Sequence, residues 1–312
     1  MNWGIIGAGN IAQRFCVSLK NEKDSVLYAI SGRNREKLES FSVKNPCKKI
    51  YIDYEEMLSD HEIDIVYLAL PNSMHFEYAQ KALMAKKAVL CEKPAVLSGK
   101  EMREIADTAR ENRTLFMEAM KPRFTPLYKE LKQELNSGLI GKIRNIDTHI
   151  FFLRPNTPSH LDPIQGGIIA DSGIYCASWY EDFCKGARVR RSYVTTYQGS
   201  SVYVRSEIDH NEAVCSVLEA GFDARRSSQA TIFGDEGYVV IDDSHRPQKA
   251  FVCLNDKEVY TIERPYIYDD FYGEIHAMIE CVKNGICDCQ IMSLDASIGC
   301  HDLLDQIRES IV

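Results

Sequence analysis

The sequence predicts an α/β protein of two domains. The first is an N-terminal doubly wound parallel sheet of the Rossmann type, and the second is a C-terminal α+β domain. Apolar runs alternate with helical patterns up to about residue 120, as in repeated βαβ units. Short runs with strand-like alternation recur after residue 187. Because 312 residues exceed the usual size of one domain, we expect domains at residues 1–120 and 121–312.

The composition is that of an ordinary globular chain, with 45% hydrophobic and 26% charged residues. A net charge of −8 argues against nucleic acid or an anionic membrane as the main partner. No apolar run approaches the roughly 20 residues of a membrane span, and the N-terminus lacks the features of a signal peptide. Eleven cysteines without a Cys-x-x-Cys motif favour reduced thiols in the cytoplasm. Only Cys287 and Cys289 lie close together, so we expect no metal site.

The first strand and the turn after it carry the strongest local signal. An apolar run at residues 2–6 predicts a strand, and a helical pattern covers residues 11–21. Between them stands Gly7-Ala8-Gly9-Asn10-Ile11-Ala12, the G-x-G-x-x-A form of a dinucleotide-binding loop. Gly7 allows the tight turn, Gly9 lets a pyrophosphate approach the backbone, and Ala12 permits close packing of the helix on the strand. We expect the phosphates at the amino end of the helix, where free amides and the dipole favour anions.

The second strand, at residues 26–31, ends without the acidic residue that would hold the ribose hydroxyls of NAD. The sequence there is Ser31-Gly32-Arg33-Asn34-Arg35. Arg33 is expected to bind the 2′-phosphate of NADP, because a guanidinium makes charge-assisted contacts with phosphate oxygens. The alternative is that Arg33 and Arg35 are solvated residues at the start of a helix over residues 35–42. The missing carboxylate and the present cation agree, and they favour NADP, with NAD as the alternative cofactor.

The other N-terminal elements continue the alternation of strand and helix. An apolar run at residues 63–70 is typical of a central parallel strand, and it ends in Pro71-Asn72-Ser73-Met74-His75. A capping box at Ser98 and Glu101 opens a helix that extends to about residue 113. The remaining expected elements are strands at 49–52, 88–91 and 114–117, and helices at 54–59 and 76–86.

The strand at residues 88–91 ends abruptly in Glu92-Lys93-Pro94. Open parallel sheets bind their ligands at the carboxyl ends of the strands. Proline lacks an amide donor and restricts the residue before it, so Lys93 is held in an extended or turned conformation. The alternative for an isolated Glu-Lys-Pro is a surface ion pair before a loop. The motifs on either side favour a functional lysine.

The C-terminal half supports a sheet of half-buried strands. Thr125 and Pro126 are typical of the cap and the first position of a helix, which Gly138 ends. Alternation from Ile146 to Phe152 predicts a strand. Further strands are expected at 189–197, 202–208, 213–220, 229–233, 238–241, 250–254 and 259–262, and helices at about 270–284 and 294–310.

A second group of candidate residues follows Gly166-Gly167. Asp171 and Tyr175 are four residues apart, so they would share one face of a helix. A carboxylate at an apolar helix start is either an N-terminal cap or a site residue, and Tyr175 taken alone is most simply a core tyrosine. These alternatives stay open on the residues alone.

Together these motifs resemble the Gfo/Idh/MocA family of NAD(P)-dependent oxidoreductases, nearest to its dihydrodiol-dehydrogenase-like and glucose–fructose-oxidoreductase-like branches. The resemblance covers nearly the whole length. The stretches that carry it are Gly7-Ala8-Gly9-Asn10-Ile11-Ala12, Pro71-Asn72-Ser73-Met74-His75, Glu92-Lys93-Pro94, Glu118-Ala119-Met120 with Arg123-Phe124, Gly166-Gly167 and Asp171-Ser172-Gly173-Ile174-Tyr175. The resemblance implies a site in which Lys93, Asp171 and Tyr175 are catalytic. It also implies a second domain built on a large, open, mainly antiparallel sheet, and a homodimer or a dimer of dimers packed sheet to sheet.

Many members of the family have histidine where this chain has Tyr175, so the identity of the proton donor is open. We expect Tyr175 to be the acid/base, Lys93 to favour its ionised form and to bind the substrate oxygen, and Asp171 to orient both. The alternative makes Lys93 the proton donor. The cofactor contacts implied are Gly7, Ala8, Gly9, Asn10, Ile11, Ala12, Ser31, Gly32, Arg33, Leu70, Pro71, Asn72, His75, Glu92, Lys93 and Arg123. His75 has a structural alternative, Glu92 is expected to be an orienting partner, and Arg154 and His160 are weaker candidates.

The expected reaction is hydride transfer between nicotinamide and an alcohol or carbonyl carbon of a sugar, a polyol, a cyclic diol or a dicarbonyl. Two other functions share the fold: a regulator that binds NAD(P) without turnover, and an NAD-dependent glycosidase. A regulator has no need of the proton relay that Lys93, Asp171 and Tyr175 would form. The residues at the end of the second strand disfavour a glycosidase that recycles NAD.

Overall fold

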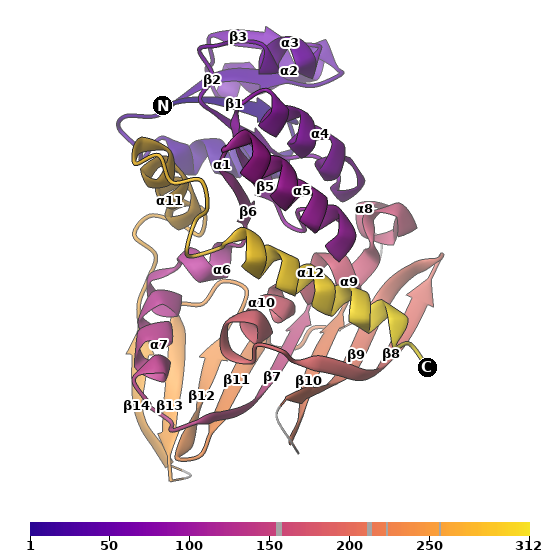
Figure 1. Cartoon of the computed structure of the whole chain (residues 1–312), viewed down its shortest axis with the longest axis vertical. Helices are drawn as coiled ribbons and strands as arrows, with labels where there is room; N and C mark the ends of the chain where they lie inside the picture. Colours follow the sequence, from indigo (N-terminus) through magenta and orange to yellow (C-terminus); the bar gives the residue numbers. More distant parts are fainter. Residues whose placement is uncertain (154–157, 211–213, 223, 256) are drawn as a thin grey trace. The chain divides into compact units, whose positions relative to one another are not determined.

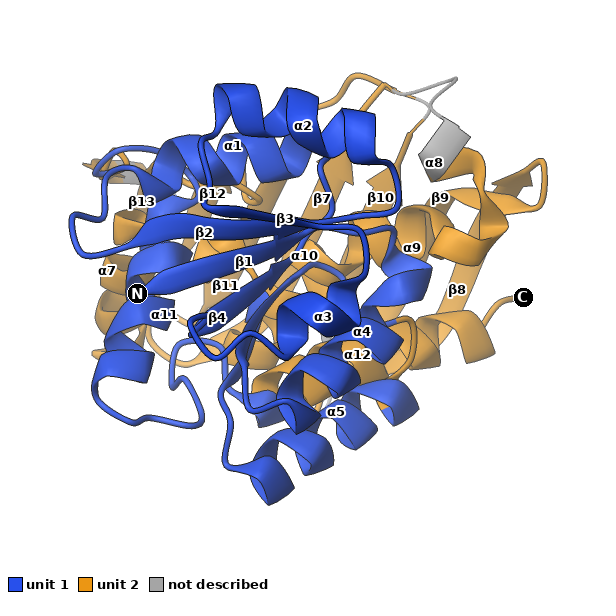
Figure 2. Cartoon of the chain, turned by 90° about the horizontal axis from the view of Figure 1, so that it is seen from above, with its two compact units in different colours: residues 1–96, 100–119, 267–295 blue, residues 97–99, 120–266, 296–312 orange. Residues whose placement is uncertain are grey.

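The computed structural model describes the chain except for residues 154–157, 211–213, 223 and 256 (Figure 1). It divides into two compact units, coloured separately in Figure 2. Unit 1 comprises Met1–Val96, Lys100–Ala119 and Ile267–Asp295. Unit 2 comprises Leu97–Gly99, Met120–Tyr266 and Ala296–Val312. The chain therefore changes unit at residues 96–97, 99–100, 119–120, 266–267 and 295–296.

Unit 1 contains a six-stranded parallel sheet in the order β3-β2-β1-β4-β5-β6, which confirms the predicted doubly wound fold. The strands are β1 (Asn2–Ile6), β2 (Val26–Ser31), β3 (Lys49–Tyr51), β4 (Ile65–Leu68), β5 (Ala88–Glu92) and β6 (Phe116–Ala119). The helices between them are α1 (Asn10–Leu19), α2 (Arg35–Lys44), α3 (Tyr54–Leu58), α4 (Asn72–Met84) and α5 (Gly99–Asn112). Strands β4, β5 and β6 are buried along their whole length, as expected of strands covered on both faces.

Helix α4 begins at Asn72, four residues before the predicted start. Pro71 takes the position before the first turn with φ −58°, which is an angle that proline favours. His75 therefore lies inside the first turn of α4 and is not part of a loop that precedes it.

Residues 267–295, which the sequence led us to assign to the second domain, belong to unit 1. Their helix α11 (Tyr272–Lys283) packs against α1. Arg14 of α1 makes a 2.6 Å ion pair with Asp270 and lies over the ring of Phe271. Ser18 donates a hydrogen bond of 2.7 Å to Asp269. These contacts join segments about 250 residues apart, and no local pattern in the sequence predicts them.

Unit 2 is built on an eight-stranded sheet in the order β14-β13-β12-β11-β7-β10-β9-β8. The pair β7–β10 is parallel and the other pairs are antiparallel, which confirms the large, mainly antiparallel sheet. The strands are β7 (Ile143–Phe151), β8 (Arg188–Tyr197), β9 (Ser200–His210), β10 (Val214–Gly221), β11 (Gln229–Gly234), β12 (Gly237–Asp242), β13 (Lys249–Leu254) and β14 (Lys257–Glu263).

Helices cover one face of this sheet. They include α9 (Gly167–Asp171), which packs on β9, and α10 (Gly173–Phe183), which packs on β7. Tyr180 of α10 donates to the carbonyl of Ile146 over 2.7 Å, and Trp179 donates to the carbonyl of Ser244 over 3.2 Å. The other helices are α6 (Lys121–Phe124), α7 (Pro126–Asn136), α8 (Pro158–Leu161), the short 3₁₀ helix η1 (Pro163–Gln165) and α12 (Leu294–Glu309). Thr125 caps α7 by accepting from the amide of Tyr128, as predicted.

In the described part of the chain, every helix is too short or too polar to cross a lipid bilayer.

The β1–α1 turn yields a stability prediction from a matched pair of glycines. Gly7 has φ +107°, and a Cβ there would lie 2.3 Å from the carbonyl oxygen of Ala69. Gly9 has φ −91°, and a Cβ there would meet nothing within 4 Å. We expect Gly7→Ala to lower the free energy of unfolding by at least about 1–3 kcal/mol, and Gly9→Ala to leave it nearly unchanged. Urea unfolding of the two variants checks this, and equal midpoints would show that the turn at Gly7 is not constrained.

Candidate active site

The β1–α1 turn has the geometry expected of a phosphate-binding loop. The amide of Gly7 donates to the carbonyl of Ser31 over 2.9 Å, which joins the ends of β1 and β2. Ala12 is fully buried, so α1 packs closely on the sheet. Gly9 is the N-cap of α1, and no side chain caps that helix end. The first-turn amides and the open space over Gly9 are what an anionic group needs in order to approach the backbone.

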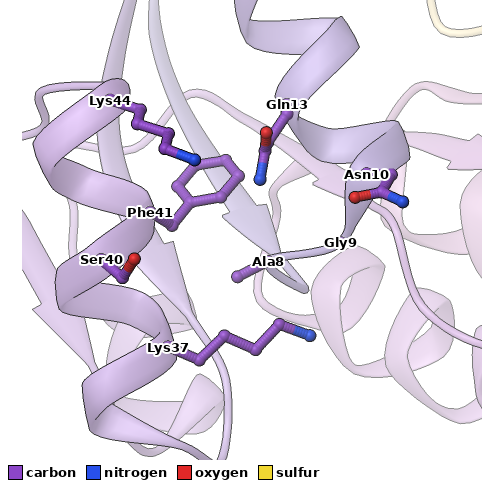
Figure 3. Close-up of a pocket in the computed structure, with 8 residues that line it drawn as sticks. All are labelled: Ala8, Gly9, Asn10, Gln13, Lys37, Ser40, Phe41 and Lys44. Carbon is purple, nitrogen blue, oxygen red and sulfur yellow. The ribbon is translucent and has the colours of Figure 1, made fainter.

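A hollow of about 340 Å³ lies between this turn and α2 (Figure 3). It is lined by Ala8, Gly9, Asn10, Gln13, Lys37, Ser40, Phe41 and Lys44. Figure 3 shows the side chains of Lys37 and Lys44 extending from α2 beside the hollow, with Gln13 reaching toward it from α1. Asn34 fixes the start of α2 by accepting from the amide of Lys37 over 2.9 Å. The hollow therefore lies between a helix terminus that favours anions and two lysines.

Sequence reasoning missed Lys37 and Lys44. A signal was present, because residues 37, 41 and 44 have the spacing of one helix face. Arg33, the residue that we predicted to bind the 2′-phosphate, is exposed and does not line the hollow. Its charge acts on Tyr78 of α4: burial raises the pKa of Tyr78, and Arg33 opposes that shift. The predicted contact between Arg33 and the phosphate stays a prediction.

The Glu92-Lys93-Pro94 turn follows β5 at the carboxyl edge of the unit 1 sheet. Tyr67 of β4 donates a 2.6 Å hydrogen bond to Glu92 Oε1. The carbonyl of Pro94 lies 2.8 Å from Nδ1 of His75, and the amide of Ala95 donates to Glu118 Oε1 over 2.8 Å. Glu92 is 6% exposed, and Tyr67, His75 and Glu118 are fully buried. Lys93 is partly exposed, so the turn presents its lysine from a rigid, buried base.

The contacts of His75 are those expected if the residue has a structural role. Its two ring nitrogens lie 2.8 Å from the carbonyl of Pro94 and 2.9 Å from the carbonyl of Leu70. Burial lowers the pKa of His75, while these carbonyls and the carboxylates of Glu92 and Glu118 act in the opposite direction. The ring thus links the segment after β4 to the segment after β5. The predicted contact of His75 with a cofactor stays a prediction.

Arg123, expected at the cofactor, is 1% exposed and held inside unit 2. Its Nε donates to Ser178 Oγ over 2.9 Å, its Nη2 donates to the carbonyl of Ser178 over 2.8 Å, and its Nη1 lies 3.6 Å from Asp182. Asp182 also accepts from Tyr128 and Lys132. These contacts tie α6 and α7 to α10, and they give Arg123 a structural role within its unit.

Asp171 and Tyr175 do not lie on one continuous helix, which corrects the sequence prediction. Asp171 ends α9, and Tyr175 is in the first turn of α10, with Ser172 between the two helices. Asp171 accepts from Ser172 Oγ over 3.3 Å and is not the N-cap of α10. The geometry before them explains the paired glycines. Gly167 has φ +59°, and a Cβ there would lie 2.3 Å from Ser201 Oγ, so α9 approaches β9 only without a side chain.

Tyr175 is 8% exposed and borders an aromatic group that includes a residue missed from the sequence. The ring of His245 lies 5.9 Å from that of Tyr175 and 5.0 Å from that of Phe152. Its Nδ1 is 2.7 Å from Asp243 Oδ1. His245 follows β12 outside any recognisable motif, so no local signal could have selected it. His160 packs 5.0 Å from Phe222, and Arg154 lies outside the described residues.

The structure thus gathers the predicted residues in two sets. Unit 1 brings together the loop from Gly7 to Ala12, Ser31 and the segments that contain Leu70, His75 and Lys93. Unit 2 holds Arg123, Asp171 and Tyr175. A relay made of Lys93, Asp171 and Tyr175 would draw on both units.

The chain is similar in sequence to known proteins of one family. Residues 1–120 match the model of the Gfo/Idh/MocA group, described as "Oxidoreductase family, NAD-binding Rossmann fold". The chain is 26% identical to a trans-1,2-dihydrobenzene-1,2-diol dehydrogenase of Xenopus tropicalis, over 99% of this chain and 97% of the relative. It is also 26% identical to the scyllo-inositol 2-dehydrogenase (NADP(+)) IolU of Bacillus subtilis (strain 168), over 100% of this chain and 97% of the relative.

Two solved structures show the same fold over the whole chain. One is KijD10, a 3-ketoreductase from Actinomadura kijaniata in complex with NADP and TDP-benzene, with a TM-score of 0.90 and 21% identity over 100% of this chain and 98% of the other. The second is a levoglucosan dehydrogenase in complex with NADH and levoglucosan, with a TM-score of 0.88 and 19% identity over 99% and 96%. The resemblance seen in the motifs is thereby confirmed: residues 1–120 match the NAD-binding Rossmann domain of the Gfo/Idh/MocA family of oxidoreductases.

Proposed function

We propose that this protein is an NADP-dependent oxidoreductase. It transfers a hydride between nicotinamide and an alcohol or carbonyl carbon of a sugar, a polyol, a cyclic diol or a dicarbonyl. The observation that carries the proposal is Lys93, which stands on a buried polar base at the carboxyl edge of an NAD-binding sheet. This is the edge at which open α/β sheets bind their ligands. The named relatives are dehydrogenases of a cyclic diol and of scyllo-inositol, which supports this class of substrate.

The nicotinamide supplies the hydride, and the residues of the chain must place the substrate and move one proton. In this proposal Lys93 donates a hydrogen bond to the substrate oxygen, and Tyr175 exchanges the proton with that oxygen. Asp171 orients the two groups. In the alternative assignment Lys93 itself gives the proton, and Tyr175 only shapes the pocket.

The preference for NADP is supported by charge. β2 ends in Ser31-Gly32-Arg33 without a carboxylate, and the hollow beside the β1–α1 turn is lined by Lys37 and Lys44. Within the described residues, neither lysine side chain makes an ion pair. Two cations without a protein counter-ion beside a phosphate-binding loop favour a cofactor with an additional phosphate. The NADP in the name of one relative and in one similar structure agrees with this preference.

A regulator that binds the dinucleotide without turnover is the second candidate. The burial of Tyr67, His75 and Glu118 beneath Lys93 argues for catalysis, because a sensor has no need of a lysine fixed in this way. An NAD-dependent glycosidase is disfavoured by the cations near β2. Mixing the protein with NADPH and a panel of carbonyl compounds, while recording nicotinamide absorbance, distinguishes a reductase from both alternatives.

We also propose that the protein is a homodimer, or a dimer of dimers, in the cytoplasm. All eleven cysteines are free thiols, which suits a reducing compartment. The sheet face of unit 2 opposite its buried residues carries the partly exposed Val217, Val240 and Phe251. Apolar side chains that stay partly exposed on the open face of a sheet can be buried by a partner.

Cofactor preference is the first test. We expect NADPH to bind roughly tenfold or more tightly than NADH, and Arg33→Ala to remove that preference because it removes a charge-assisted contact. Arg35→Ala is the matched control, since Arg35 is occupied by Glu39 at 3.8 Å. Fluorescence titration of the unmodified protein and of each variant with both cofactors measures the affinities. If Lys37→Ala removes the preference and Arg33→Ala does not, the phosphate is held in the hollow beside α2.

The proton relay is the second test. Lys93→Met keeps the apolar stem and removes the charge, so hydride transfer should fall by roughly 10²–10⁴-fold while NADPH still binds. Tyr175→Phe should lose a comparable factor, and the double variant less than the product of the two. Lys100→Met, an exposed lysine at the start of α5, is the control. Single-turnover reduction with prebound NADPH separates the outcomes. A loss at Lys93 alone makes the lysine the acid, and unimpaired turnover in Lys93→Met refutes its catalytic role.

Assembly is the third test. Light scattering at micromolar concentration should give about twice the mass of the 312-residue chain, or a multiple of that. Val240→Lys should yield monomers, because it places a charge in the middle of the proposed interface. Val43→Lys, at a valine that is 82% exposed in unit 1, should leave the mass unchanged. A monomeric mass for the unmodified protein contradicts the proposal.

A further inference from the structure

We propose that Tyr67 is a positioning residue for Lys93. Its hydroxyl fixes the carboxylate of Glu92, and through Glu92 it sets the orientation of the lysine that follows. This inference rests on the proposed function, in which Lys93 contacts the substrate oxygen. It concerns a strand residue that is fully buried and has no part in any of the recognised motifs.

The turn that contains Lys93 is held at three points, and each support comes from a different element. Tyr67 of β4 contacts the side chain of Glu92 at 2.6 Å, His75 of α4 contacts the carbonyl of Pro94 at 2.8 Å, and Glu118 of β6 contacts the amide of Ala95 at 2.8 Å. We call these three residues the Lys93 cradle. Two of them hold backbone groups after Lys93, and Tyr67 holds the side chain immediately before it. Tyr67 is therefore the cradle residue that controls the charged neighbour of Lys93.

The protonation state of this contact is well defined. Burial raises the pKa of Tyr67 well above its ordinary value, and the negative charges of Glu92 and Glu274 act in the same direction. Tyr67 consequently keeps its proton at neutral pH, and it donates while Glu92 accepts. A donor of this kind next to a carboxylate makes a short and directional bond. Glu92 is thus held by a partner that is neutral at neutral pH.

The ring of Tyr67 is as constrained as its hydroxyl. It stacks on Phe15 of α1 with centroids 3.8 Å apart and an interplanar angle of 13°, and Phe15 in turn packs 5.2 Å from Trp3 of β1. The amino end of α1 is the predicted phosphate-binding site. Tyr67 therefore connects two parts of unit 1 that must keep a fixed spacing for hydride transfer: the helix that binds the dinucleotide, and the strand end that bears Lys93.

Tyr67→Phe separates these roles, because it keeps the ring and its stack on Phe15 and removes only the hydroxyl. We expect kcat to fall roughly ten- to a hundredfold, as a small misplacement of a catalytic group does. The KM for NADPH should stay within about twofold, because the β1–α1 turn is untouched. A general loss of folding would instead lower the amount of active enzyme.

The chain offers a matched control for stability. Tyr128 is a buried tyrosine in unit 2 whose hydroxyl donates to Asp182 over the same 2.6 Å. Tyr128→Phe removes an equivalent hydrogen bond that has no part in the Lys93 cradle, so it should lower the unfolding midpoint about as much as Tyr67→Phe and leave kcat nearly unchanged. Equal losses of kcat in the two variants, or no loss in Tyr67→Phe, would overturn the proposal.

A second readout does not depend on turnover. Lysines labelled with ¹³C by reductive methylation give separate NMR signals, and Lys93→Arg identifies the signal of Lys93. In Tyr67→Phe this signal should move toward the position of a solvated surface lysine, whereas in Tyr128→Phe it should not move. If the unmodified protein reduces no carbonyl compound, the proposed function fails while the NMR result still decides whether Tyr67 positions Lys93. An unchanged Lys93 signal in Tyr67→Phe would overturn the inference even in an active enzyme.

Discussion

The constraint on which the site depends is the burial of polar groups beneath the carboxyl edge of the unit 1 sheet. Tyr67, His75 and Glu118 are fully buried, and each makes a hydrogen-bond contact with the segment from Glu92 to Ala95. A buried donor or acceptor that loses its partner costs about 1–3 kcal/mol. A shifted turn would break several of these contacts together, so one arrangement of the strand end is strongly preferred. Lys93 gains a fixed position without being buried itself.

The dinucleotide loop lies at the same edge of the sheet, and its requirement is the opposite of buried polar side chains. Here function needs side chains to be absent. At Gly7 a Cβ would collide with the segment after β4, and over Gly9 open space gives an anion access to the amides of α1. The stack of Phe15 on Tyr67 links the loop to the cradle through the core. The glycine turn proposed to bind the dinucleotide and the cradle proposed to orient Lys93 are thereby packed against each other in unit 1.

Elements governed by local chemistry were predictable from the sequence, and contacts between distant segments were not. The G-x-G-x-x-A turn, the positions of the six strands of unit 1 and the Thr125 cap of α7 each depend on neighbouring residues, and all three are present. The assignment of residues 267–295 to unit 1 depends on Arg14 and Asp270, which are 256 residues apart. The break at Ser172 was missed because spacing alone does not show where a helix ends. His245 could not be found, because its approach to Tyr175 follows from the course of the chain after β12.

The number of protons on the ring of His75 determines which of its two contacts are hydrogen bonds. Its two ring nitrogens face two carbonyl oxygens, those of Pro94 and Leu70, and a carbonyl can only accept. Both contacts are hydrogen bonds only if the ring has two protons, and burial, which lowers its pKa, disfavours that state. A neutral ring has one N–H and therefore satisfies one carbonyl at a time. The tautomer with Nδ1–H holds the turn that bears Lys93, and the tautomer with Nε2–H holds the segment after β4 that precedes Asn72. Within the cradle, Tyr67 donates to the turn and Glu118 accepts from the amide of Ala95, so the tautomer of His75 is the element of the cradle that can exchange without moving the backbone.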